Sequence, residues 1–576
     1  MLTHYKQNIF KNKKIAISFL LLPALIYLLI FACISLNINY VAFDDIVILG
    51  IIPQINEAST WYEGWKALIS LFPEHRLVFS RGIVLLLYTL FGHLNLIWLM
   101  SIGNICWMLC ILFFFHAFKT LQLKLWYFVP IAWLWFNIQS NENIFWGVSS
   151  LCNFGVLFFV IGSIYITVFR PDLFVVSIIL AVFATYTYGN GMLVFPVLLC
   201  IHLLRSSYRR LGVTALVFFV ITILYFSDFK PITQNLDLTN WVHVREGFLG
   251  FFAFFGSIVT LKSSGFSYTT MLISSAVGII ITLLYLLISR SEIVSSLQSV
   301  FRKKVALNNV FLFSLGIFLF VIITALALVY KRIPSDGFEG MFKGRYSMYS
   351  TLILVSLYFL FLQANIRWKS KIFRVVLPLS IILNVVITHQ NFAVAVEGRR
   401  TAIAQEFNAR YNRDWHGLRM FEMEQSHYEE IRSFYNSEDP LAENKQLFES
   451  FSSDSNLDNT PFRIDSMLVV NNQLFIQMDI QGFVVQKDFS DGVYLILKSD
   501  QHLYAAPSHQ NPVPIKTTIR RLKYFSPKMS GNFHASTVEP GEYEFQILAR
   551  LNGINKIYKT ARKVIRDDTG LISVVN

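Results

Sequence analysis

The sequence predicts an α-helical polytopic membrane protein with a β-rich soluble domain at its C-terminal end. Hydrophobic residues make up 54% of the 576 residues, and the mean hydropathy is +0.51. Apolar runs long enough to cross a membrane recur until about residue 390. From about residue 462 the pattern changes to short alternating or β-branched segments separated by turn residues. A chain this apolar is not an ordinary soluble protein.

The apolar runs are the elements that we expect to form membrane spans. We count about eleven of them, at 15–36, 93–118, 125–139, 147–169, 173–188, 191–205, 211–227, 269–289, 309–330, 347–365 and 374–390. A further run at 247–260 is ambiguous, because it can cross the membrane or lie re-entrant. We expect the re-entrant form, since a full crossing would place the basic segment 290–304 outside.

The distribution of charge predicts the orientation of these spans. Before residue 391 the chain has 28 basic and 13 acidic residues, whereas the rest has 21 basic and 23 acidic ones. With the run at 247–260 re-entrant, eighteen basic residues and two acids fall on the side of the basic N-terminus. The positive-inside rule then makes the N-terminus cytoplasmic, and an odd number of spans leaves the chain after residue 390 outside. The net charge of +13 therefore reflects orientation, and we expect no nucleic-acid partner.

The changes in composition divide the chain into three regions. Residues 1–390 form the predicted transmembrane domain, whose first outer loop covers 37–92. A charged helical segment and a polar linker follow at 391–461. Residues 462–576 contain strand-like stretches such as "NNQLFIQMDI" and "GEYEFQILARL", which predict a small antiparallel β-sandwich outside the membrane.

The first outer loop carries two clusters of charged residues. Asp44 and Asp45, in "FDD", follow the first span directly. Carboxylates at a membrane surface cost free energy unless they are hydrated or engaged, so they are functional candidates, with a solvated helix cap as the alternative. Glu74, His75 and Arg76, in "EHR", stand near the other end of the loop, where folding back can bring both clusters to one site. A surface salt-bridge cluster is the alternative for the second group.

The part of the loop between these clusters is amphipathic. Apolar residues at helical spacing around Trp61 and Trp65 predict a helix that lies in the membrane interface and covers a cavity between spans. Arg81 follows the second cluster. It either contacts a substrate or extends to phosphate headgroups.

Later outer loops supply further candidates for substrate binding. Lys343, Arg345 and Tyr346, in "KGRY", stand at the mouth of the next span. A guanidinium binds phosphate oxygens with two hydrogen bonds, although an ordinary positively charged membrane edge is the alternative. Trp146 in "FWG" and Asn190 in "YGNG" either stack on and hydrogen-bond to a sugar or stand in plain tight turns.

Taken together, the acidic pair, the amphipathic first loop, the number of spans and the outer tail resemble the GT-C class of membrane glycosyltransferases. The resemblance covers roughly residues 1 to 390 and rests on the short motifs "FDD", "EHR", "FWG" and "GRY". It implies a bacterial cytoplasmic (inner) membrane enzyme that takes a hexose from a polyprenyl-phosphate carrier. The implied acceptor is a glycan or lipid-linked molecule of the cell envelope, such as O-antigen or lipopolysaccharide.

The resemblance also implies a mechanism. It places the first-loop acid on Asp44 or Asp45, which acts as the general base on the acceptor hydroxyl or, in metal-dependent relatives, as a ligand of Mg²⁺ or Mn²⁺. The sequence does not choose between these roles or between the two residues. Direct displacement inverts the anomeric centre, and basic side chains stabilise the departing phosphate. No other cofactor is expected.

Other classes of membrane protein share parts of this pattern. A lipid-linked glycan transporter or flippase is expected to carry charges or Gly/Pro breaks at mid-membrane depth, whereas the acids here cluster at the outer ends of spans. An O-antigen polymerase or ligase is expected to have a large late outer loop, and the loop at 331–346 is short. A non-catalytic sugar-binding scaffold is the third alternative.

Overall fold

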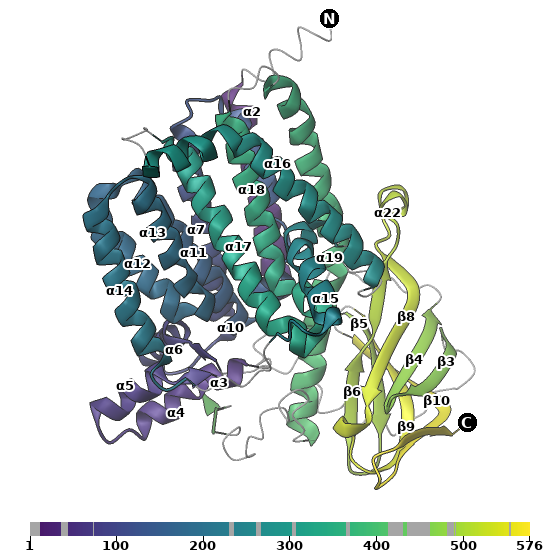
Figure 1. Cartoon of the computed structure of the whole chain (residues 1–576). Helices are drawn as coiled ribbons and strands as arrows, with labels where there is room; N and C mark the ends of the chain where they lie inside the picture. Colours follow the sequence, from purple (N-terminus) through teal and green to yellow (C-terminus); the bar gives the residue numbers. More distant parts are fainter. Residues whose placement is uncertain are drawn as a thin grey trace, which may run out of the picture. The chain divides into compact units, whose positions relative to one another are not determined.

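The computed structural model describes most of the chain (Figure 1). It covers residues 12–575 except for 36–43, 73, 230–235, 261–266, 302–306, 365–368, 413–429, 432, 435–460, 481–488, 490 and 552–553. Much of the segment and linker predicted at 391–461 therefore lies outside the described residues. The chain divides into a helical unit (1–29, 47–92 and 98–388) and a β unit (30–46, 93–97 and 389–576).

The helical unit is a bundle of apolar helices. Within the described residues, nine helical stretches are long and apolar enough to cross a membrane. They are α2 (Lys13–Ser35), α7 (Leu96–Lys119), α10 to α11 (Gly147–Phe169), α14 (Tyr208–Phe226), α15 with η5 (Trp241–Val259), α16 (Tyr268–Phe301), α17 (Asn309–Asp336) with η7 (Gly337–Phe342), η8 (Gly344–Tyr346) with α18 (Ser347–Gln363), and α19 (Lys369–Asn412). The chain is thus a multi-pass helical membrane protein, as predicted.

The individual spans differ from the prediction in two ways. The ambiguous run at 247–260 belongs to a helix, Trp241–Val259, that is long enough to cross. The runs at 125–139, 173–188 and 191–205 form shorter apolar helices, within Leu125–Trp135, Pro171–Thr187 and Gly189–Leu204. Each of these begins with a 3₁₀ turn, and the last two start at Pro171 and Gly189, residues that interrupt regular helix.

Helices α15 and α16 approach each other more closely than ordinary side chains allow. A Cβ atom on Gly256 would lie 2.0 Å from the carbonyl oxygen of Ser274, and one on Gly278 would lie 1.8 Å from that of Phe252. The two backbones are therefore in direct contact. Packing through small residues is the usual way in which membrane helices associate, because lipid gives them no hydrophobic reason to do so.

The first loop folds into short elements. They are α3 (Asp45–Leu49), α4 (Ile51–Asn56), α5 (Trp61–Ile69), the hairpin of β1 (Leu71–Phe72) and β2 (His75–Arg76), and α6 (Val78–Phe91). The expected helix is α5, which is capped at its start: Thr60 Oγ1 accepts from the Glu63 amide at 3.2 Å, and the Glu63 carboxylate accepts from the amide of Ser59, the residue before the cap, at 2.7 Å. Figure 1 shows α4 and α5 lying across the direction of the bundle helices, and Trp61 is 83% exposed. This arrangement suits an interfacial helix.

The β unit contains two antiparallel sheets. The strands are β3 (Phe462–Val470), β4 (Gln473–Ile480), β5 (Gly492–Lys498), β6 (Leu503–Pro507), β7 (His509–Pro512), β8 (Phe525–His534), β9 (Gly541–Leu551), β10 (Ile554–Arg566) and β11 (Ile572–Val575). One sheet has the order β11-β10-β9-β5-β6, and the other has the order β3-β4-β8-β7. The predicted C-terminal β-rich region is confirmed.

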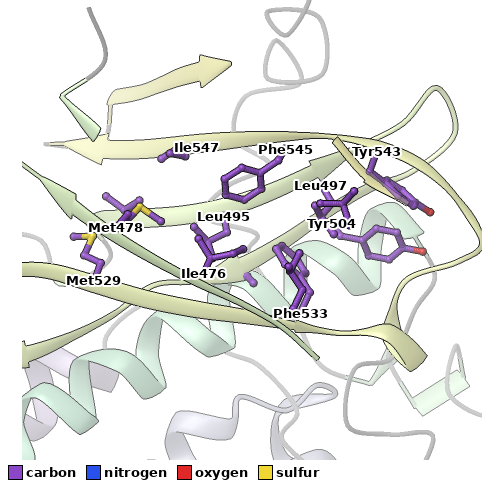
Figure 2. Close-up of a cluster of buried hydrophobic side chains, with 14 of the residues drawn as sticks. Ile476, Met478, Leu495, Leu497, Tyr504, Met529, Phe533, Tyr543, Phe545 and Ile547 are labelled. Atoms are coloured by element: carbon purple, nitrogen blue, oxygen red, sulfur yellow. The ribbon is translucent and has the colours of Figure 1, made fainter. Parts of the chain in front are cut away.

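Side chains from both sheets form one core (Figure 2). Ile476 of β4 and Phe533 of β8 belong to the same buried cluster as Leu495 of β5 and Phe545 of β9. The last turns of α19 cover the other face of the larger sheet, where Phe407 joins a second buried cluster. The apolar residues of the strands thus contribute to two hydrophobic layers, one between the two sheets and one between the larger sheet and α19.

Candidate anion-binding site

Four cations gather where α17 ends and α18 begins, and we call Lys331, Arg332, Lys343 and Arg345 the basic cluster. Helix α17 ends at Gly337, whose φ of +61° lies in the left-handed region that glycine adopts without strain. Two 3₁₀ turns, η7 and η8, then reverse the chain into α18. The reversal brings the cations at the end of α17 and those of the following turns to the same end of the bundle.

Most of the basic cluster is paired with carboxylates. Lys331 Nζ lies 3.3 Å from Glu74 Oε1, which links the cluster to the first loop. Asp336 pairs with Lys343 and lies 3.5 Å from Arg332 Nη1. These contacts hold three of the four cations in place.

Arg345 differs from the other members of the cluster. Within the described part of the chain it has no carboxylate within ion-pair distance, and its Nε is buried without a hydrogen-bond partner. The nearby Glu142 Oε1 accepts from the backbone amide of Gly344 at 2.8 Å. The largely buried guanidinium hydrogen-bonds to Tyr346, whose ring centroid lies 5.6 Å from Arg345 Cζ, but this contact supplies no carboxylate. An anionic ligand would therefore stabilise the guanidinium. Arg345 is therefore the best-placed group for binding an anion.

His75 stands beside this cluster as a neutral imidazole. Its ring centroid lies 4.3 Å from that of Tyr188, and the nearby charges that act on it include Arg332 and Arg345. Burial lowers the pKa of His75 to about 4, against the opposing effect of Glu74. Among the described residues, its Nδ1 has no hydrogen-bond partner.

The turn after α12 (Phe174–Thr187) is built around His75. A Cβ atom on Gly189 would lie 2.6 Å from His75 Nδ1, so a side chain does not fit there. Burial raises the pKa of the Tyr188 phenol, which stays protonated at neutral pH. Next to it, Asn190 Nδ2 donates to the Tyr349 hydroxyl at 2.6 Å, and the buried Asn190 Oδ1 has no partner in the described structure. The predicted "YGNG" turn thus faces both the first loop and α18.

The segment after α8 (Val129–Trp135) supports Arg345 from another side. In α9 (Asn141–Phe145), Asn143 Nδ2 donates to the carbonyl oxygen of Arg345 at 2.8 Å, and Ser149 Oγ donates to Asn143 Oδ1 at 2.9 Å. Trp146 stands half-buried between α9 and α10. A small polar hollow nearby is lined by Gln139, Ser257, Thr260, Met341, Phe342, Lys343 and Ser347.

The other predicted residues hold the first loop together. The Arg76 guanidinium is buried, donates to the carbonyl oxygens of Tyr225 and Ile69, and pairs with Asp228. Arg81 is also buried and donates to backbone carbonyl oxygens in and after α5, including that of Ser70 at 2.6 Å. Both side chains therefore shape the loop, and the snorkelling alternative for Arg81 does not describe its position.

The two acids of "FDD" lie at the start of α3. Asp45 is its first residue and is 1% exposed, whereas Asp44 is half-buried in the preceding turn. Both belong to the β unit, while the basic cluster belongs to the helical unit. Their place in a reaction stays a prediction.

Some residues of the site were not singled out from the sequence. Lys331 and Arg332 lie in the same predicted loop as Arg345, and Glu142 and Tyr188 lie in the segments that contain Trp146 and Asn190. The missed signal is the pairing of two carboxylates with the 331–345 segment: Glu74 pairs with Lys331, and Glu142 accepts from the amide of Gly344. Among the described residues, no group of three or more His, Cys, Asp or Glu side chains could hold a metal ion.

Comparisons with known proteins add no assignment. No family model matches the chain, and neither the curated proteins nor the solved structures contain a significant match.

Proposed function

We propose that this protein is a membrane glycosyltransferase that takes a sugar from a polyprenyl-phosphate donor. The observation that carries the proposal is Arg345, a largely buried arginine without an ion-pair partner among the described residues, within a cluster of groups suited to an anion and a sugar. Four segments predicted from the sequence contribute to this cluster: the first loop, the residues 140–147 around "FWG", "YGNG" (188–191) and "KGRY" (343–346).

The charge of the site favours an anionic donor. Lys331, Arg332 and Lys343 pair with Glu74 or Asp336, whereas Arg345 has no carboxylate within ion-pair distance among the described residues. A phosphate oxygen of a polyprenyl-phosphate sugar can supply the missing negative charge at Arg345.

The neighbouring groups suit a sugar. The unpartnered Asn190 Oδ1 and the neutral His75 Nδ1 can each accept a hydrogen bond from a hydroxyl group. Tyr188 offers an aromatic ring, and Trp146 lies in the adjacent segment. A buried polar atom without a partner is a natural ligand contact.

In the proposed reaction, the acceptor hydroxyl attacks the anomeric carbon while a base, Asp44 or Asp45, removes its proton. The bond between the anomeric carbon and the phosphate oxygen breaks, and Arg345 stabilises the polyprenyl phosphate as it leaves. The anomeric centre is inverted. We place the reaction at the outer face of the bacterial cytoplasmic membrane, where a lipid-carried donor replaces nucleotide sugars.

Glycan mass analysis tests this proposal. Envelope glycans from cells with the gene, without it, and with the Arg345→Ala variant are compared by mass spectrometry. A loss of one sugar unit, both without the gene and in the variant, supports a transferase. A flippase, by contrast, does not transfer sugar from a synthetic polyprenyl-phosphate donor to the acceptor in detergent. Failure of the purified protein in this assay would therefore reject the proposal.

A further inference from the structure

A small projection stands at the end of one hairpin in the β unit. Helix α22 (Ile515–Arg521) connects β7 to β8, and Figure 1 shows it extending beyond the strands. The amide of Val513 donates to the carbonyl oxygen of Tyr524 at 2.7 Å, which closes the hairpin at its base. We call residues 514–523 the basic finger.

The surface of the basic finger combines cations with exposed apolar side chains. Ile519 is 72% exposed, and Leu522 is 92% exposed in a left-handed backbone conformation with φ of 50°. Four cations are exposed around them, namely Lys516, Arg520, Arg521 and Lys523. The sequence has no acidic residue between Asp500 and Glu539, and none of the four cations forms an ion pair in the described structure. The finger is therefore cationic as well as apolar.

This combination is not needed for the stability of the domain. Leu522 contributes almost no buried area, and the core of the two sheets is complete without it. Exposed apolar side chains flanked by Lys and Arg are typical of elements that rest on a membrane surface, where the cations meet anionic headgroups and the apolar groups enter the acyl boundary.

The basic finger is attached to α19. His389 Nε2 lies 3.1 Å from Thr518 Oγ1, and the Tyr524 hydroxyl, which donates to the carbonyl oxygen of His389, accepts from the amide of Ala393 at 3.0 Å. These contacts fix the finger at one level of the helix.

The attachment point follows a row of exposed apolar residues on the same helix. These residues recur every three or four positions, at Val375, Leu379, Ile382 and Val385. On a helix apolar enough to span a membrane, such a row can face lipid. His389 follows Val385 by four residues, which is about one helical turn, so the finger is joined to α19 close in sequence to this row.

We propose that the basic finger docks on the anionic phospholipid headgroups of the bilayer that the protein itself spans, with Ile519 and Leu522 inserted at the acyl boundary. The proposal depends on the membrane character of the chain and not on its enzymatic activity. The occupant is lipid rather than a protein because the two features of the finger, clustered positive charge and two apolar tips, match the two layers of an anionic membrane surface.

Depth-dependent quenching tests the proposal in the full-length protein. Leu522→Cys is labelled with a fluorescent probe in a background in which Cys33 and Cys200, the two native cysteines that are not buried, are replaced by Ser. The protein is placed in nanodiscs that contain phosphatidylglycerol and spin-labelled lipid. The matched control is Leu571→Cys, since Leu571 is another exposed leucine of the β unit, 63% exposed.

We expect spin-labelled lipid to quench the probe at position 522 at least about twofold more than the probe at position 571. Replacing Lys516, Arg520, Arg521 and Lys523 by Gln should remove most of this difference, as should phosphatidylcholine alone, because both remove the electrostatic attraction. Equal quenching at the two positions overturns the proposal. A probe at 522 that is protected from aqueous iodide but not quenched by spin-labelled lipid indicates a protein partner, such as a second copy of the chain, and also overturns it.

Discussion

Arg345 is the residue on which the proposed donor site depends most. A charge-assisted contact to phosphate is worth on the order of 2 to 5 kcal/mol when it is desolvated. We therefore expect Arg345→Ala to lose most sugar transfer, and Arg345→Lys to be impaired too, because an ammonium cannot reproduce the two-pronged contact. Arg290→Ala, at an exposed arginine of the same unit, is the control. Wild-type rates in both Arg345 variants would reduce this residue to a headgroup anchor.

The two acids of "FDD" should contribute unequally to the reaction. Asp45 is buried at the first position of α3, whereas Asp44 is half-buried in the turn before it, so the two carboxylates lie in different surroundings. Asn is nearly isosteric with Asp but cannot take the proton, so replacing the base should lower turnover by roughly two to four orders of magnitude.

We expect Asp44→Asn to be the damaging change and Asp45→Asn to cost much less, with both variants assayed at matched expression. If both acids hold a metal ion, both variants fail and a chelator inhibits the wild type. Near-normal transfer by both variants would remove the acids from the proposed active site.

At the scale of single residues, the sequence predicted which segments meet better than it predicted what each side chain contacts. The segments around His75, Asn190 and Arg345 do meet. The neighbours Arg76 and Arg81 were grouped with them because a motif does not show which way each side chain points. Their guanidiniums instead bind backbone carbonyl oxygens, a role that only the folded loop reveals.

At the scale of elements, the hydropathy pattern predicted long helices well and short ones less well. A run of apolar residues shows that a segment is buried or faces lipid, but it does not show where a 3₁₀ turn begins or how far the regular helix extends. This is why 125–139 was expected to span although its helical part ends at Trp135. The strands were easier to predict than the short helices. Each sheet has one face in the shared core, so a shift of register by one residue would expose the apolar side chains of that face.

The contact between α19 and β7 should depend on pH. His509 Nδ1 lies 2.5 Å from Glu397 Oε2, and the hydrogen bond to this carboxylate raises the pKa of His509 above its usual value near 6.5. A raised pKa means that the pair stabilises the fold fully below about pH 6.5 and loses this effect as the pH rises through the folded-state pKa.

Both partners are about one-third exposed, so the contribution is about 1 kcal/mol or less. Thermal unfolding of the full-length protein should therefore show a larger loss of stability between pH 6 and pH 8.5 in the wild type than in His509→Gln. His534→Gln, at an exposed histidine of β8, is the control. The same pH dependence in all three proteins would mean that the pair contributes nothing.

For the whole molecule, the charge distribution predicts that everything after about residue 391 is outside the cytoplasm. Protease added to intact spheroplasts should remove this region, whereas cytoplasmic marker proteins should stay protected. Antibodies against the β unit and against an N-terminal tag can follow the two ends separately. Full protection of the β unit would contradict the orientation, and the long helix Trp241–Val259 would then be the first segment to count as an additional span.

The close contact between α15 and α16 also has a consequence for biosynthesis. The two helices are neighbours along the chain, and their contact uses the glycines and backbone carbonyls that they contain, together with Ser275 Oγ, which donates to the carbonyl oxygen of Leu249 at 2.7 Å. Such a short-range pairing forms without waiting for distant partners. The pair can therefore leave the insertion machinery as a preassembled hairpin, before α17 and α18 are synthesised. A bulky residue at Gly256 or Gly278 would then act during synthesis, by releasing two separate helices into the membrane.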